Sequence, residues 1–464
     1  MKKQKQVLSV FSLVMINVIA VDNLRTLPIS AKLGLSLVSY YLIAALIYFI
    51  PVALVAAELA TAYPKTGGIY IWVREAFGRQ SAFVTIWLQW IYNVVWYPTI
   101  LIFIAETFAY LYNPALASNK IYLVSTVVSL FWLFTLLNCF GMRLSSLISI
   151  VGASAGTLLP MIGISLLGLI WIIQGHPLAL DTNASWLPDF SSIGNLSIFS
   201  AVLFGLLGVE MSAIHAEDVK NPQRDYPKAL LYSVIIIFST LVFGSLAITA
   251  VVPSDTLNVI SGFIDAYSIF FNSYHMPWMT SITILFVIVG GLSGVSAWII
   301  GPSRGLLISA HDGCLSHHFT RVNKHGAPVF ILISQACIVT ALSCLLLLVD
   351  SISSAYWMLT ELCAQLALLV YVFMFAAGIK LRHTQPDIPR AYKVPGGKVG
   401  MWLIAGAGLM CCVVTILIGF VPPTQIPISN RIFFEAFLVG GLILFVVIPW
   451  VLAAKYNDKK ANRI

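Results

Sequence analysis

Apolar residues along this chain fall into twelve long stretches, and polar residues gather in the gaps between them. The stretches cover residues 8–30, 36–61, 81–112, 121–138, 147–173, 192–216, 229–252, 276–310, 328–349, 354–379, 400–421 and 431–454. A helix needs about 20 mostly apolar residues to cross the hydrocarbon core of a bilayer. The pattern therefore predicts an all-α membrane protein with twelve transmembrane helices, forming a single polytopic domain over residues 1–464.

The composition excludes a water-soluble globular protein. Charged residues make up 9% of the chain and hydrophobic residues 59%, against about 25% and about 45–50% in soluble proteins. No nucleotide-binding loop, nucleophile elbow or zinc-protease motif is present, and the gaps are too short for a catalytic domain. The histidines between residues 311 and 325 are more typical of a solvated loop than of a metal site. We therefore expect no enzymatic activity, no cofactor and no metal.

Lysine and arginine are concentrated in every second gap, and this distribution predicts the orientation of the chain in the membrane. With the N-terminus in the cytoplasm, all but four of the 26 basic residues fall on the cytoplasmic side, as the positive-inside rule requires. An even number of spans returns the C-terminus to the same side. The net charge of +8 thus reflects topology and contact with anionic lipid, and nucleic-acid binding is not expected.

The first span is interrupted by polar residues near its middle. Apolar residues lead up to Val21, and then follow Asp22, Asn23, Leu24, Arg25, Thr26, Leu27 and Pro28. Buried ionisable residues in a span default to a functional role, and proline disfavours helix at the residue before it. The alternative is that the span ends at Val21. That would leave too few apolar residues for a crossing, so a broken helix is favoured.

The sixth span contains a second interruption. Gly205, Leu206, Leu207, Gly208 and Glu210 lie well inside its apolar stretch, and glycine weakens a helix by up to about 1 kcal/mol relative to alanine. A straight helix with glycines for close packing is the alternative, but it leaves Glu210 unexplained. Two breaks five spans apart predict an inverted repeat. Its halves would be residues 8–173 and 192–379, with two additional spans over 400–454.

Three further residues suggest gating or proton coupling. Trp298 precedes Gly301-Pro302 in the eighth span, where it could close a central cavity or simply anchor the interface. Glu106 in the third span and Glu361 in the tenth are intramembrane acids. Either could carry a proton or pair with a base.

The segment after the second span resembles a motif of the amino acid–polyamine–organocation (APC) transporters. It combines an acid, a proline, a glycine pair, an aromatic residue and a closing glycine, at Glu58, Pro64, Gly67-Gly68, Tyr70 and Gly78. Residues 208–227, 297–305 and 323–328 extend the likeness to the glutamate/γ-aminobutyrate antiporters within that superfamily. The resemblance implies a five-plus-five inverted repeat with two extra spans. It also implies a central site between broken spans 1 and 6, and alternating access.

The chain also departs from those antiporters. It has Asp22-Asn23-Leu24-Arg25 where they have an aromatic-rich stretch, and Gly294 where a glutamate would precede Trp298. Its sequence ends at Ile464 without the long C-terminal plug of the acid-resistance antiporter. The resemblance therefore leaves the substrate open, and we expect transport without activation by acid.

These observations predict an amino acid exchanger of a bacterial-type inner membrane, whose partner is an amino acid or an exchanged amine. Substrate contacts are expected from Asp22, Asn23, Arg25 and Thr26 in span 1, and from Leu206, Leu207, Gly208 and Glu210 in span 6. Asp22 and Arg25 could instead neutralise each other. A proton-coupled symporter using Glu106, Glu210 or Glu361 is the alternative. A sensor that binds without transport is a third reading, although no signalling domain is evident.

Overall fold

Helices account for nearly all regular structure in this protein. The computed structural model describes residues 8–65, 67–140, 154–181, 183–212, 219, 221–428 and 430–461. These residues contain no β-strand, and one isolated bridge joins Leu8 to Val219. The helices before residue 180 are α1 (Val10–Val21), η1 (Leu24–Thr26), α2 (Leu27–Ala31), η2 (Gly34–Ser36), α3 (Leu37–Ala44), η3 (Ala45–Phe49), α4 (Ile50–Ala62), α5 (Ile69–Phe77), α6 (Arg79–Tyr112), η4 (Pro114–Ser118), α7 (Lys120–Cys139), η5 (Ser154–Leu158) and α9 (Leu159–Ile173).

The second half of the chain is equally helical. Its helices are α10 (Ile193–Ser197), α11 (Phe199–Phe204), α12 (Pro222–Val251), α13 (Gly262–Ser273), α14 (Trp278–His311), η7 (His317–Thr320), α15 (Val329–Ser343), α16 (Leu345–Leu348), α17 (Ile352–Thr384), α18 (Gly397–Ile418) and α19 (Arg431–Ala461). The prediction of an all-helical protein is confirmed over the described residues.

The helices match the predicted spans closely. Ten of the described helices are long and apolar enough to cross a membrane, and the bent pair α1 and α2 adds an eleventh crossing. The predicted span 192–216 begins as a shorter apolar helix, Ile193–Phe204, and its last residues lie outside the described part of the chain. The total of twelve and the inverted repeat therefore stay predictions.

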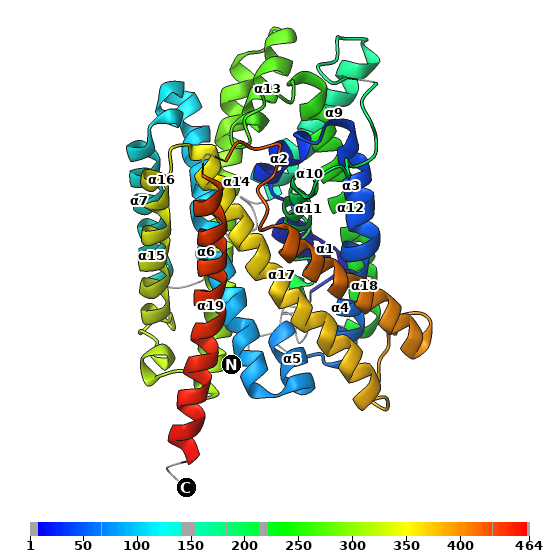
Figure 1. The fold of residues 1–464 in the computed structure, drawn as a ribbon, viewed down its shortest axis with the longest axis vertical. Coiled ribbons are helices and arrows are strands. Elements are labelled where there is room, and N and C mark those ends of the chain that lie inside the picture. Colours follow the sequence, from blue (N-terminus) through cyan, green and yellow to red (C-terminus); the bar gives the residue numbers. More distant parts are fainter. Residues whose placement is uncertain are drawn as a thin grey trace.

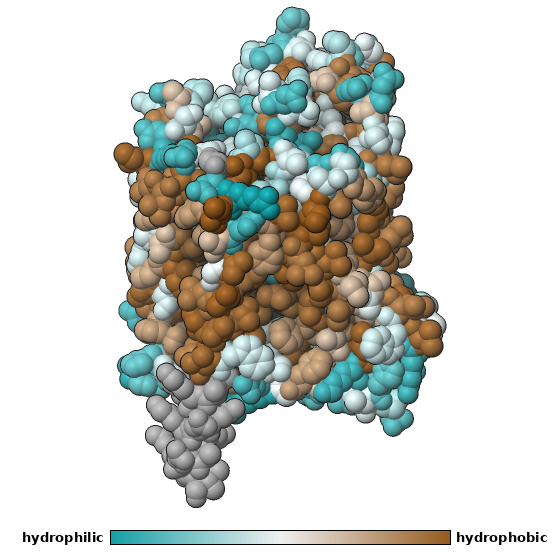
Figure 2. Space-filling model, viewed as in Figure 1, coloured by the Kyte–Doolittle hydropathy of each residue, from teal (hydrophilic) through white to brown (hydrophobic). Residues whose placement is uncertain are grey.

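Hydropathy alone does not predict α5 and α13, which are too short to cross a bilayer. They lie at opposite ends of the molecule, α5 at the lower end and α13 at the upper end in Figure 1. Between these ends, apolar side chains form a broad belt, while hydrophilic side chains gather above and below it (Figure 2). Large apolar side chains are exposed on the helices α9, α18 and α19, and they include Leu166, Leu403 and Ile443. An apolar belt of this kind belongs to an integral membrane protein.

Two long helices form the centre of the bundle. The apolar stretches of α6 and α17 are the most deeply buried of the candidate spans, and α6 packs against both α14 and α17. Helix α17 crosses the middle of the molecule obliquely in Figure 1. By contrast, few residues are buried in the apolar stretches of α7, α18 and α19. The central helices therefore supply the frame against which the first and sixth spans are held.

A buried acid ties α4 to α17 at the lower end of the molecule. Glu58 Oε1 accepts from Arg382 Nη1 at 2.8 Å and lies 3.2 Å from Arg390 Nε. Its Oε2 accepts from the backbone N–H of Val394 at 2.7 Å. The side chains of Glu58 and Arg390 are each 2% exposed. The acid of the motif after span 2 is thus a structural element that pairs with two arginines.

We expect Glu58→Gln to destabilise the fold by about 3–5 kcal/mol, because it leaves two buried guanidinium groups without a counter-charge. The measurement is thermal unfolding of the purified protein in detergent. Glu435→Gln is the matched control, because the ion pair of Glu435 among the described residues is with exposed Arg431, and an exposed pair contributes about 0–1 kcal/mol. Equal unfolding temperatures for the two variants would show that the Glu58 cluster contributes nothing.

Candidate functional site

The first break separates α1 from α2. Helix α1 ends at Val21, Asp22 and Asn23 have extended backbone conformations, and the chain resumes as η1 and α2 with a bend of 42°. The side chain of Asn23 accepts from the backbone N–H of Arg25 at 3.3 Å, as a helix-capping residue does. Asp22, Arg25 and Thr26 are at most 4% exposed. The helix is therefore interrupted at residues 22–26 as predicted, and the residues after Val21 stay buried inside the molecule.

The second break follows α11. The helix ends at Phe204, and residues 205–210 form turns in place of a helix. Gly208 has a φ of 106°, which side-chain-bearing residues rarely adopt. Its backbone N–H donates to Tyr371 Oη at 2.9 Å, and the N–H of Ser212 donates to Asn17 Oδ1 at 3.0 Å. Side chains therefore replace the missing helical hydrogen bonds, as buried backbone inside a membrane requires.

The two breaks lie against each other. The Arg25 guanidinium lies over the ring of Phe204, 4.9 Å from its centroid. A methyl group added at Gly208 would lie 3.5 Å from the carbonyl oxygen of Ala20, and one at Gly205 would lie 3.6 Å from Thr26 Oγ1. The prediction that both interruptions are adjacent across the bundle is confirmed.

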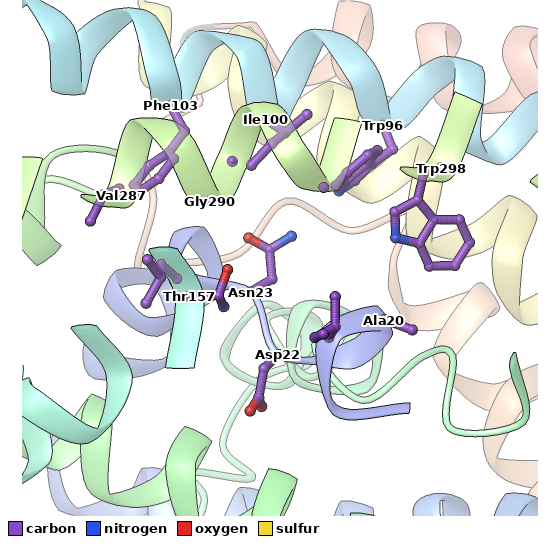
Figure 3. Close-up of a pocket in the computed structure, with 14 residues that line it drawn as sticks. Ala20, Asp22, Asn23, Trp96, Ile100, Phe103, Thr157, Val287, Gly290 and Trp298 are labelled. Carbon is purple, nitrogen blue, oxygen red and sulfur yellow. The ribbon is translucent and has the colours of Figure 1, made fainter. Parts of the chain in front are cut away.

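A small cavity borders the first break. Its volume is about 40 Å³, which is room for a few water molecules. The walls come from the first break, α6, η5 and α14 (Figure 3). They consist of Ile19, Ala20, Asp22, Asn23, Leu24, Trp96, Ile100, Phe103, Thr157, Val287, Gly290, Gly291, Gly294 and Trp298.

Aromatic rings close one end of this cavity. Trp298 on α14 lies beside Trp96 on α6, with ring centroids 6.2 Å apart, and both border the cavity in Figure 3. Gly290, Gly291 and Gly294 on α14 also line the cavity. No atom lies within 4 Å of where a Cβ at Gly294 would be, whereas a Cβ at Gly290 or Gly291 would clash with Gly156 or Ile104. This location agrees with a gate at Trp298, whose movement stays a prediction.

Asp22 and Arg25 point in different directions and are not an ion pair in the described structure. Thr240 Oγ1 on α12 lies 3.0 and 3.1 Å from the two carboxylate oxygens of Asp22. Arg25 Nη1 donates to Tyr356 Oη on α17 at 3.3 Å. Figure 3 shows Asn23 pointing toward α6 while the Asp22 carboxylate points the opposite way. Mutual neutralisation of Asp22 and Arg25 is therefore absent from this conformation.

Arg25 is a buried charge with few partners in the described part of the chain. Its side chain is completely buried, and its Nε and Nη2 atoms have no hydrogen-bond partner among the described residues. No described acid lies within 4.0 Å of it, because the ion pairs found there involve other residues. A buried guanidinium without an anion is costly, so this position favours an incoming anion.

Glu210 is held by a tyrosine of α17. Tyr371 Oη lies 2.8 Å from both of its carboxylate oxygens and also accepts from the Gly208 N–H. One side chain thus fixes the break and its acid together. The ring of Tyr371 in turn packs on Tyr48, with centroids 5.7 Å apart.

The remaining predicted residues are distributed around this centre. Leu206 and Leu207 are buried in the second break but do not line the cavity. Glu361 on α17 accepts from Ser200 on α11 and lies beside Gly419, away from the cavity. Glu106 borders a different cavity at the upper end of α6. The intramembrane acids are therefore dispersed, and Glu210 alone belongs to the second break.

The whole chain matches one protein family. The family model described as "Amino acid permease" matches residues 6–446. The chain belongs to the amino acid permease family. These permeases are transporters of the APC superfamily, as the sequence motifs predict.

Three relatives align with this permease over most of the length of both chains. An uncharacterized transporter of Legionella pneumophila is 66% identical over 459 residues, which are 99% of each chain. A glutamate/γ-aminobutyrate antiporter of Lactococcus lactis is 29% identical over 441 residues, covering 94% of this chain and 88% of the relative. A probable agmatine/putrescine antiporter of the same species is 22% identical over 456 residues, covering 98% and 96%.

Several residues that hold the two breaks of this permease are not evident from its sequence. Tyr356 and Tyr371 on α17, Thr240 on α12 and Asn17 on α1 hold the two breaks. When a single polar or aromatic residue lies within an apolar span, the neighbouring sequence does not indicate such a role. The packing of α17, α12 and α1 against the breaks identifies them.

Proposed function

We propose that this permease is an amino acid antiporter that works by alternating access in a bacterial inner membrane, with both termini in the cytoplasm. Its first ten spans would form a five-plus-five inverted repeat, and the two spans over 400–454 would be additional. The observation that carries this proposal is the contact between the two breaks beside a cavity bordered by Trp298. Discontinuous helices of this kind hold the substrate near the bilayer midplane in secondary transporters.

The proposed substrate site combines backbone and side-chain groups from both breaks. The helices that end at Val21 and Phe204 present the partial negative charge of their C-termini, which suits the ammonium group of an amino acid. Asn23 borders the cavity and would bind the amino or carboxyl group together with Thr26. Asp22 would receive a cationic group. Leu206, Leu207, Gly208 and Glu210 do not line the cavity in the described conformation, and they would form the opposite wall once the cavity opens toward the second break.

Arg25 would set the preference among substrates. Its unpaired, fully buried guanidinium offers two parallel donors to a carboxylate. An amino acid with an acidic side chain supplies that carboxylate in addition to its own. Relatives named as glutamate/γ-aminobutyrate antiporters support this choice.

The described conformation is proposed to be a closed state. A cavity of about 40 Å³ holds a few waters, so an amino acid enters only after helices around the breaks move. Displacement of Trp298 from Trp96 would enlarge the cavity directly. Such movements are the expected consequence of alternating access.

Counterflow in proteoliposomes tests the proposal. Vesicles loaded with unlabelled glutamate should take up labelled glutamate, whereas empty vesicles should not. A proton symporter would instead fill empty vesicles when an inward proton gradient is imposed, and the lumen would acidify. Screening the common amino acids and their decarboxylation products in the same assay identifies the exchanged pair. No uptake of any of these compounds under either condition would contradict a transport function.

A further inference from the structure

A second and larger cavity lies at the end of the molecule opposite α5. Its volume is about 280 Å³. It is formed where the end of α6, η4, the turn before α13 and the start of α17 meet. The central site does not include any of its lining residues.

The wall of this second cavity is polar and carries an acid without a base. Glu106, Tyr110, Ser118, Asn258, Ser261 and Ser353 line it, and none of its lining residues is lysine or arginine. The hydroxyl of Tyr110 donates to Asp265 Oδ1 at 2.7 Å, and that of Ser261 donates to Asp265 Oδ2 at 3.0 Å. Because these protons are used, both hydroxyl oxygens can still accept from a ligand.

Glu106 is the acid of this cavity that has no partner among the described residues. Its residue surface is only 3% exposed, and it borders the cavity. Among the described residues, its carboxylate has neither a hydrogen bond nor an ion pair, in contrast to Asp265 nearby. A buried carboxylate without a partner is costly. A cation that enters the cavity would remove that cost.

The surrounding acceptors fit an ammonium group. An ammonium nitrogen has three N–H donors and no acceptor, so one carboxylate and two hydroxyl oxygens satisfy it. We propose that this cavity is a second ligand site, which binds the ammonium group of an amino acid or amine with Glu106 as its counter-ion. The inference rests on the proposed function, because the ligand is the transporter's own cargo on its way to or from the central site.

The test is a binding measurement on the full chain in detergent, with labelled γ-aminobutyrate as the probe. We expect two bound molecules per chain, one of which is displaced by n-butylamine, since this competitor has an ammonium group but no carboxylate for the central site. Glu106→Gln should weaken the butylamine-sensitive fraction at least about tenfold, since it removes a charged partner of a buried ion pair. Glu106→Asp should retain it in part.

Two further variants separate the site from general damage. Glu435→Gln removes an exposed carboxylate that pairs with Arg431 on α19 and should leave both bound molecules in place. Ala117→Trp fills the cavity from η4 without changing any charge, and should abolish the butylamine-sensitive fraction. A single bound molecule per chain, displacement by sodium ions instead of butylamine, or unchanged binding in Glu106→Gln would each overturn the proposal.

Exchange assays keep this outcome separate from that of the proposed function. If wild-type vesicles exchange amino acids while Glu106→Gln binds as the wild type does, the second site is wrong and transport stands. If no compound is exchanged but Glu106→Gln still loses the butylamine-sensitive fraction, the second site stands and the antiporter proposal fails.

Discussion

Replacing Arg25 with glutamine is expected to lower kcat/KM for acidic amino acids at least about 30-fold, since removing one partner of a buried charge pair costs about 2–5 kcal/mol. The reason is that Arg25 is fully buried and has only Tyr356 and the ring of Phe204 as partners among the described residues. Uptake of neutral amino acids should fall much less. The measurement is counterflow with acidic, neutral and basic amino acids in parallel.

Asp22→Asn and the double variant distinguish a substrate contact from a structural pair. Asp22 accepts from Thr240 on α12 and Arg25 donates to Tyr356 on α17, so the two single variants should shift the substrate profile independently. The exposed Arg431→Gln serves as the control for a lost positive charge. If the single variants fail to express and the double variant recovers with an unchanged profile, Arg25 and Asp22 form a structural pair instead.

Gly208→Val is expected to reduce exchange to the level measured in vesicles that contain no unlabelled substrate. The φ of 106° at Gly208 is strongly unfavourable for a β-branched residue, and relief of that strain would move the N–H that donates to Tyr371. The backbone conformation of the second break would then change, and Tyr371 would no longer hold Glu210 in place. Initial rates of counterflow measure the effect, with Gly208→Ala expected to be intermediate.

Gly406→Val provides the matched control, because no atom lies within 4 Å of where a Cβ at Gly406 would be and α18 is an ordinary helix there. Protein amount and thermal unfolding should be compared for both variants. Wild-type exchange by Gly208→Val would show that the bent conformation at residue 208 is not needed for function.

The sequence is sufficient to predict the spans and both breaks because their physical causes are local. Long apolar stretches can only become buried or membrane-facing helices. Asp22, Asn23 and Pro28 interrupt one of them, and Gly205 and Gly208 interrupt the other. No distant residue is needed to decide that these segments resist a continuous helix.

The partners within the site depend on tertiary packing and could not be predicted in this way. Asp22 and Arg25 lie three residues apart, which places them on one face of a helix. The segment is extended at residues 22 and 23, however, so the two side chains diverge. The partners of Glu58 could not be predicted for the same reason. By sequence, Arg382 and Arg390 fit a solvated cytoplasmic gap. In the structure, both arginines pack against this acid with little exposed surface.

An experimental structure with the exchanged amino acid bound tests the central claim most directly. The compound taken up fastest in counterflow should be added before cryo-electron microscopy. We predict ligand density between residues 22–26 and 205–210, with a ligand carboxylate within about 3.2 Å of the Arg25 guanidinium. Continuous helices through both segments, or ligand density bound away from both breaks, would contradict the account.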